Sequence, residues 1–273
     1  MPLAKIGDIH IHYQVRGLGE SLLLIMGYRG SSFMWGETLI NGLSRYFQVI
    51  TFDNRGTGLS DKPDMLYTIP MMADDAAGLL HYLGLTRTHI FGVSMGGMIA
   101  QELALRHPKR VQRLILGCTT CGGPQTVLAP VHVLEKLLAS PDMPREEALR
   151  QQWQVIFSPG FIEKDPTFLD HLSAVALTYP TPFHSSLRQM MAIQRFNAYG
   201  RLGQIVAPTL VVTGAEDMVM PPANSHLLAD RIHNAVFESF ADAGHGFFWE
   251  ATTELIGLLG DFCYPHLRSE INA

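Results

Sequence analysis

The segment from Ile90 to Gln101 constrains the fold more than any other part of this 273-residue chain. A short apolar run leads to Ser94, and a helical pattern follows it. Gly92 and Gly96 stand two positions before and after the serine. A serine on so sharp a strand-to-helix turn has strained backbone angles, and its neighbours must be nearly atomless for the chain to fold back. The pattern predicts a nucleophile elbow rather than an ordinary turn.

Apolar runs alternate with helical patterns through the first part of the chain. We expect strands over residues 9–15, 22–25, 47–52, 89–93 and 111–117, and helices over residues 33–46, 69–83 and 94–107. The continuous run at 22–25 is typical of a strand that is buried on both faces. Such alternation predicts an α/β fold with a mostly parallel sheet and helices on both faces.

The middle of the chain has a different pattern, without buried strands. Helical stretches are expected over residues 131–138, 145–155, 168–177 and 185–196, and the sheet pattern returns with strands at 209–213 and 235–240. This predicts a sheet-containing core in two parts, 1–121 and 201–273, with a helical insertion at 122–200 that sits over the sheet as a lid. Trp153 and Phe157 supply part of its apolar area and are candidates for substrate contact.

Composition excludes several function classes. Charged residues make up 16% of the chain, the net charge is −5 and there is no basic stripe, so no nucleic-acid partner is expected. No apolar run reaches the length of a membrane span, and the first eight residues lack the pattern of a secretory signal. We therefore expect a cytoplasmic protein with no membrane partner, and the sequence leaves open whether it forms a homodimer.

The cysteines and two early histidines could suggest a metal or redox site. Three cysteines make a disulfide framework improbable, and Cys118 and Cys121 follow an apolar run at a strand end. We expect them to be buried structural thiols rather than a redox or zinc pair. His10 and His12 alternate along the first expected strand and are expected on the exposed face of an edge strand. No metal site is predicted.

A serine nucleophile needs a base, and the base needs a carboxylate that orients it. In open parallel sheets, catalytic groups gather at the carboxyl ends of the strands. Asp217 follows the strand at 209–213, and His245 lies in a glycine-flanked loop after the last strand. These two residues are therefore the best candidates to assist Ser94.

Other carboxylates compete with Asp217. Asp53 also follows a strand, but in its turn-rich loop we expect it to pin the turn through backbone hydrogen bonds or through Arg55. Glu216 is a weaker rival. Asp242 lies on the same loop as His245 and cannot easily reach behind the imidazole ring.

With these residues assembled, almost the whole chain resembles the α/β-hydrolase superfamily. The matching segments are 24–28, 52–60, 92–97, 214–217 and 244–245. The resemblance implies a mostly parallel eight-stranded sheet flanked by helices, with a helical cap inserted after the sixth strand. It also implies Ser94 as nucleophile, His245 as base, Asp217 as its orienter, and the backbone N–H groups of Met95 and Tyr28 as oxyanion hole.

One segment departs from the family pattern. Members often carry His-Gly after the third strand, and this chain has Met26 and Gly27 there. The backbone donor should survive, because it does not depend on the side chain. Arg29 is unusual in this loop, and it is either a contact for a substrate carboxylate or a solvated loop residue.

Within the superfamily, the chain is similar to small carboxylesterases, enol-lactonases and cofactor-free perhydrolases. Ser94 at the elbow argues against dehalogenases and epoxide hydrolases, since a dehalogenase needs an aspartate there. We predict a serine hydrolase that cleaves a small ester or lactone with no cofactor and no metal. Hydrolysis of a carbon–carbon bond, peracid formation, and a non-catalytic ligand receptor on the same scaffold remain alternatives.

Overall fold

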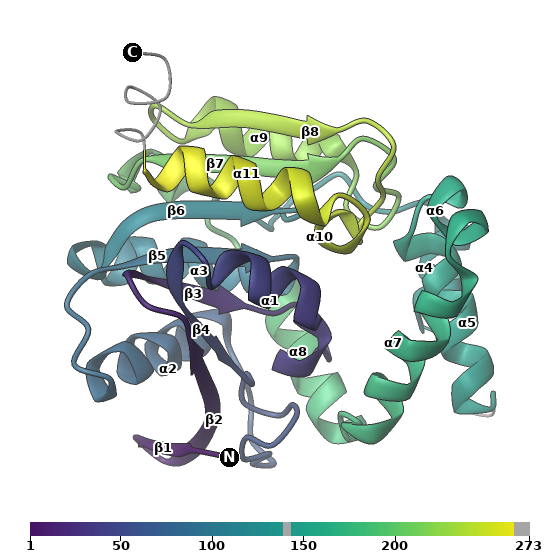
Figure 1. The fold of residues 1–273 in the computed structure, drawn as a ribbon, viewed down its shortest axis with the longest axis horizontal. Helices are drawn as coiled ribbons and strands as arrows, with labels where there is room; N and C mark the ends of the chain where they lie inside the picture. Colours follow the sequence, from purple (N-terminus) through teal and green to yellow (C-terminus); the bar gives the residue numbers. More distant parts are fainter. Residues whose placement is uncertain (139–142, 265–273) are drawn as a thin grey trace.

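The computed structural model describes residues 1–138 and 143–264. Its strands form one sheet in the order β1-β2-β4-β3-β5-β6-β7-β8 (Figure 1). They are β1 (Leu3–Ile6), β2 (Ile9–Arg16), β3 (Glu20–Ile25), β4 (Phe47–Phe52), β5 (Thr88–Val93), β6 (Val111–Gly117), β7 (Thr209–Gly214) and β8 (Val236–Phe240). β2 pairs antiparallel with β1 and β4, and all later pairings are parallel. The predicted mostly parallel eight-stranded sheet is confirmed.

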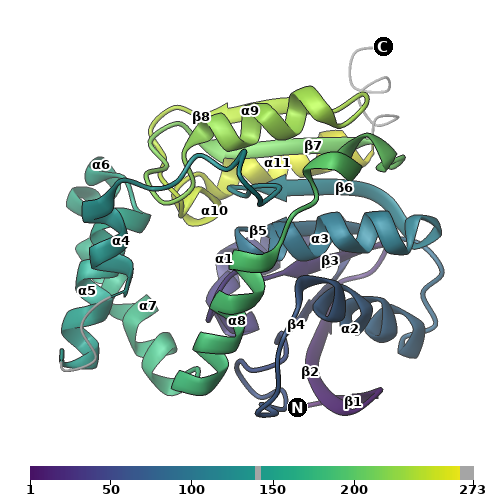
Figure 2. The ribbon, with the colours of Figure 1, turned by 180° about the vertical axis from the view of Figure 1, so that it is seen from behind.

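Helices cover both faces of the sheet, as the apolar pattern of β3 requires. Leu23 and Ile25 join one core cluster, whereas Leu22 and Leu24 join the other, because successive side chains point to opposite faces. The first face is covered by α2 (Ile69–Tyr82), α3 (Met95–Arg106) and α9 (Pro222–Arg231), and the second by α1 (Glu37–Leu43) and α11 (Thr252–Cys263). Figures 1 and 2 show these two layers from opposite sides.

The N-terminal hairpin corrects one prediction. β1 was not expected, and because it pairs with β2, β2 lies inside the sheet and not at its edge. His10 is exposed as predicted, but His12 is fully buried, and its Nδ1 lies 2.8 Å from the Asp53 carboxylate. The prediction of an exposed His12 was wrong because residues 53–60 after β4 pack against it, and the alternating pattern of β2 carries no sign of that loop.

The expected helix over 33–46 is interrupted. A 3-10 turn over Ser32–Trp35 ends at Gly36, which has φ +75°, and α1 begins at the next residue. A positive φ cannot be continued as a right-handed helix, and glycine adopts it without steric cost. The short helices α6 (Pro159–Lys164) and α10 (Phe247–Glu250) were not predicted either.

Between β6 and β7 the chain leaves the sheet layers. Here lie α4 (Val131–Leu138), α5 (Arg145–Ile156), α6, α7 (Pro166–Thr178) and α8 (Phe183–Arg195), followed by 3-10 turns over Tyr199–Gln204. Helices α4 to α7 stand to one side of the sheet, and α8 leads back to it (Figures 1 and 2). The four helices expected in this region are confirmed, and each of their ends lies within two residues of the prediction. We call this group the cap.

Aromatic side chains join the cap to the core. Phe157 and Phe168 of the cap have ring centroids 5.4 and 6.3 Å from that of Trp249 in the core. Phe33, in the first 3-10 turn, stacks on Tyr179 of the cap at 4.0 Å. Such pairs are each worth roughly 0.5–1.5 kcal/mol beyond the area they bury.

Among the described residues, no helix has the length and apolarity needed to cross a bilayer.

Candidate active site

Ser94 stands at the tip of the turn between β5 and α3. Its backbone angles are φ 55° and ψ −121°, a conformation that residues with a side chain rarely adopt. A Cβ added at Gly92 would lie 2.2 Å from the carbonyl oxygen of Gly96, and one added at Gly96 would lie 2.0 Å from that of Ile25. Both glycines are therefore required sterically, and the predicted elbow is present.

Asp217 and His245 meet at the same edge of the sheet. Asp217 follows β7, and its Oδ2 lies 2.8 Å from Nδ1 of His245, which follows β8. Its other oxygen accepts the backbone N–H groups of Val219 and Met220 at 2.9 and 2.8 Å. Asp217 is 3% exposed, so this carboxylate is fixed by three hydrogen bonds and shielded from solvent. It is held so that it orients the imidazole ring.

The loop that carries His245 is tied to both β7 and the cap. A Cβ at Gly214 would lie 2.2 Å from the carbonyl oxygens of Ala243 and Gly244, so the two loops pack backbone to backbone. Glu250 accepts the N–H groups of Gly244 and of Ser158 in the cap, each at 2.9 Å. Sequence reasoning missed Glu250, because a glutamate in a short helix carries no signal of such a bridge.

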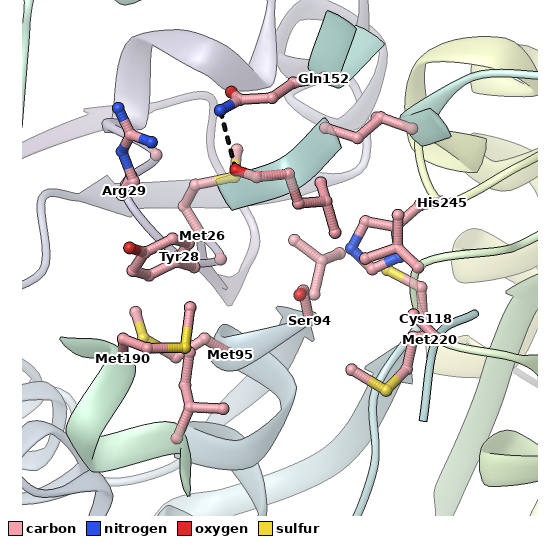
Figure 3. A pocket seen from close by; sticks show the side chains of 18 of the residues that line it. Met26, Tyr28, Arg29, Ser94, Met95, Cys118, Gln152, Met190, Met220 and His245 are labelled. Atoms are coloured by element: carbon pink, nitrogen blue, oxygen red, sulfur yellow. Dashed lines mark hydrogen bonds between the residues drawn. The ribbon is translucent and has the colours of Figure 1, made fainter. Parts of the chain in front are cut away.

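Ser94 and His245 face the same cavity. Both residues line it, and Figure 3 shows the serine hydroxyl and the imidazole ring in this pocket. Burial alone would lower the pKa of His245, but the adjoining Asp217 carboxylate and Cys118 raise that pKa well above its ordinary value of 6.5. A base with a raised pKa holds a proton from the nucleophile more firmly.

Two backbone N–H groups adjoin Ser94. That of Met95 stands at the N-terminus of α3, where the helix dipole favours negative charge. Tyr28 follows Gly27, and a Cβ added at Gly27 would lie only 3.1 Å from Cβ of Ser94, so this loop lies against the serine. The side-chain amide of Asn54 holds the loop by donating to the Met26 carbonyl at 2.9 Å. The two segments that carry the predicted donors thus lie against Ser94.

The rival carboxylates have other roles or positions. Asp53 is fully buried and accepts the N–H groups of Ser32 and Leu59 at 2.6 and 2.8 Å, so it pins its turn through the backbone. Arg55 pairs with Asp75 instead, with Nε 2.6 Å from the carboxylate. Glu216 and Asp242 are exposed.

The cavity has a volume of about 640 Å³ and a mostly apolar lining. Six methionines line it, from the core and from the cap: Met26, Met34, Met95, Met98, Met190 and Met220. Methionine side chains are flexible and polarizable, so such a wall adapts to different apolar shapes. Trp153 lines the cavity as predicted, and its Nε1–H donates to Ser173. Phe157 does not line it and packs behind the wall on Phe161 and Trp249, which corrects its prediction as a contact residue.

Arg29 lines the cavity beside Tyr28 (Figure 3). It has φ 62°, and its backbone is clamped by the cap, since its N–H donates to Gln189 and its carbonyl accepts the hydroxyl of Thr181. Burial and the positive charge of Arg29 lower the pKa of Arg145, a second lining residue, so the two guanidinium groups repel each other. No carboxylate is among the described residues that line the cavity.

Cys118 is a site residue that the sequence did not indicate. It was predicted to be a buried structural thiol, and it is buried, as is Cys121. Cys118 also lines the cavity, directly after β6 and between the strand ends that carry Ser94 and Asp217. Burial raises the pKa of the Cys118 thiol, although His245 nearby lowers it.

A family model for the alpha/beta hydrolase fold matches residues 20–158, half of the chain. The chain belongs to the α/β-hydrolase family. Its relatives include proteins that carry the name carbamate hydrolase RutD. The one from Caulobacter vibrioides is 30% identical over 247 residues, covering 87% of this chain and 89% of the relative. The one from Azorhizobium caulinodans is 29% identical, covering 90% and 92%.

Solved structures of α/β hydrolases superpose on nearly the whole chain. The enol-lactonase from Burkholderia xenovorans LB400 has 25% identity and a TM-score of 0.85, covering 96% of this chain and 99% of its own. Est816, described as an N-acyl homoserine lactone degrading enzyme, has 29% identity and a TM-score of 0.78, covering 94% and 98%. Together with the sequence relatives, they support a hydrolase of this fold.

Proposed function

We propose that this α/β hydrolase cleaves carboxylic esters or lactones through an acyl-enzyme on Ser94. One observation carries the proposal. His245, hydrogen-bonded to Asp217, lines the same cavity as the elbow serine Ser94. The three groups come from the ends of β5, β7 and β8, and they supply a nucleophile, a base and an orienting carboxylate.

The reaction runs in two halves on the same residues. Ser94 Oγ attacks the carbonyl carbon while His245 takes the hydroxyl proton, and Asp217 stabilises the imidazolium that forms. His245 then gives this proton to the leaving alkoxide as the carbon–oxygen bond breaks. In the second half, His245 takes a proton from water, the hydroxide attacks the acyl group, and the acid departs as Ser94 regains its proton.

The carbonyl oxygen becomes an oxyanion in both halves. We assign the N–H groups of Met95 and Tyr28 to bind it, and each such donor is worth about 3 kcal/mol of transition-state stabilisation. Both belong to the backbone, so the absence of the usual histidine at Met26 does not remove a donor. The hydrogen bond from the Asn54 side chain to the Met26 carbonyl holds this loop and keeps the Tyr28 N–H in place before substrate binds.

The cavity favours substrates with an apolar acyl or alcohol group. A volume of about 640 Å³ walled by methionines and Trp153 suits a group larger than acetyl. We assign residues 122–200 to the cap that selects this group, and Arg29 to contact any carboxylate on the substrate. A pocket of this size and polarity suits a small polar carbamate less well, although the same three residues could attack its carbonyl.

The decisive test uses Ser94→Ala. Ester turnover on 4-nitrophenyl acetate and butyrate should fall by roughly four to six orders of magnitude. A serine-directed phosphonate should label the wild type on Ser94 and leave the variant unlabelled. Ser239→Ala, which removes an exposed hydroxyl on β8, serves as the matched control and should keep full turnover.

The same assay separates the alternatives. Lactones, carbamates, vinylogous diketones, and acetate with hydrogen peroxide form one substrate panel for the wild-type protein. Faster turnover of a diketone or peracid formation would redirect the assignment to carbon–carbon cleavage or perhydrolysis. Tight ligand binding without phosphonate labelling would indicate a receptor, and undiminished turnover by Ser94→Ala would refute the acyl-enzyme.

A further inference from the structure

Cys118 shares its buried environment with two groups of the proposed triad. One ligand atom each from Cys118, Asp217 and His245 lie within 4.8 Å of one another. The three residues are 0%, 3% and 9% exposed. Hydrolysis as proposed uses the carboxylate and the imidazole but gives the thiol no part.

The position of Cys118 is fixed by the sheet. β6 lies between β5 and β7, so the residue after β6 falls between the elbow and the acid loop. Its N–H donates to the Val212 carbonyl at 2.8 Å, and its φ of 41° lies in a region that side chains disfavour. The thiol is free, lines the cavity and is held beside the imidazole ring (Figure 3).

Sulfur, nitrogen and oxygen donors in one place suit a thiophilic divalent cation. A tetrahedral Zn²⁺ with bonds of about 2.0–2.3 Å keeps its ligand atoms roughly 3.4–3.6 Å apart. The three groups already lie within 4.8 Å of one another, so small side-chain movements bring them into range. Because the cavity reaches Cys118 and His245, water can take the fourth position.

We propose that Cys118, His245 and Asp217 form a binding site for Zn²⁺ or Cd²⁺, and that occupancy of this site stops hydrolysis. The cation replaces the thiol proton, which passes to solvent, and binds the lone pair of one ring nitrogen and one carboxylate oxygen. A coordinated imidazole cannot accept the Ser94 proton. The inhibitory half of this proposal rests on the proposed function, whereas the binding half does not.

Binding is tested with Cd²⁺ on protein freed of metal by a chelator. Equilibrium dialysis should give one Cd²⁺ per chain at this site, with the ultraviolet absorption of a cadmium thiolate. Loss of a direct ligand should weaken binding at least about 100-fold in Cys118→Ala and in Cys118→Ser. Asp217→Asn should weaken it too, which distinguishes a three-ligand site from a lone thiol. Cys121→Ala and Cys263→Ala remove other buried thiols and should bind like the wild type.

Inhibition is measured on each protein relative to its own metal-free rate. Cd²⁺ should suppress ester turnover of the wild type and of the Cys121 variant, and leave Cys118→Ala unaffected. Cd²⁺ binding that is absent, or that is unchanged in the Cys118 variants, would overturn the proposal. Cys118-dependent binding to a protein without hydrolytic activity would instead refute the proposed function and leave the metal site standing.

Discussion

The two walls of the cavity differ in how they are built. The core wall carries Ser94 and His245, with Asp217 bound to His245 behind it; all three lie at strand ends and are held by hydrogen bonds or by glycine packing. The cap wall carries apolar side chains such as Trp153 and Met190 on helices that contact the core through aromatic rings and hydrogen bonds. Side-chain positions are therefore fixed in the core wall, whereas the side chains of the cap wall can adapt. We infer that the core wall sets the chemistry and the cap wall sets the choice of substrate.

The largest loss of activity is expected from a change in the core wall. Asp217→Asn should lower kcat by about four orders of magnitude on every ester, because an amide holds the imidazole in the wrong tautomer. Its neighbour Glu216 is exposed and has no predicted role, so Glu216→Gln is the matched control and should stay within about twofold of wild type. A loss confined to some esters would mean that Asp217 acts on substrate choice, contrary to the division proposed.

The pH dependence of kcat/KM in the wild type and in Asp217→Asn tests how the carboxylate acts on His245. Only neutral His245 acts as a base, so kcat/KM should fall as the pH drops through the pKa of His245. Since the Asp217 carboxylate contributes to raising that pKa, the midpoint for the wild type should lie above 6.5. Asp217→Asn removes the negative charge, and its residual activity should show a midpoint at lower pH. Equal midpoints in the two proteins would show that the carboxylate does not set the basicity.

A smaller and selective effect is expected in the cap wall. Trp153→Phe shortens a side chain that lines the cavity and removes its hydrogen bond to Ser173. KM for esters of bulky acids should change about 10-fold, the order expected for a few methylenes in an apolar pocket, while acetate esters should react normally. Ser173→Ala removes only the hydrogen bond and is the control for stability. Equal effects on all esters would contradict a role in selection.

The two walls also differ in how far the sequence predicts them. The elbow follows from local sterics at Gly92 and Gly96, and the acid and base follow from their places after strands. Phe157 lies beyond the end of α5, as the helix expected over 145–155 implies, but its ring packs on Phe161 and Trp249 and not into the cavity. How the cap docks on the core is a tertiary fact that the sequence of one helix does not reveal.

Buried polar groups show the same limit within the core. His12 and Cys118 were both assigned from local patterns, one as exposed and one as inert. Their surroundings depend on segments that are distant in the sequence, Asp53 and Ser60 after β4 in the first case and β7 in the second. Such contacts are set by the whole chain, so periodicity within one segment does not reveal them.

The smallest predicted effect lies where the walls meet. Arg29 belongs to a core loop, but Gln189 and Thr181 of the cap fix its backbone, and its half-buried guanidinium has no carboxylate partner among the described residues. Arg29→Gln should lower kcat/KM for 4-nitrophenyl hemiglutarate by about 5- to 10-fold, since a charge-assisted hydrogen bond in a partly solvated site is worth about 1 kcal/mol. The uncharged pentanoate ester, similar in length, should react within about twofold of wild type. Arg195→Gln, which changes a charge at the end of α8 outside the cavity lining, is the control. Equal losses on the two esters would make Arg29 a support for the Tyr28 loop rather than a contact for substrate charge.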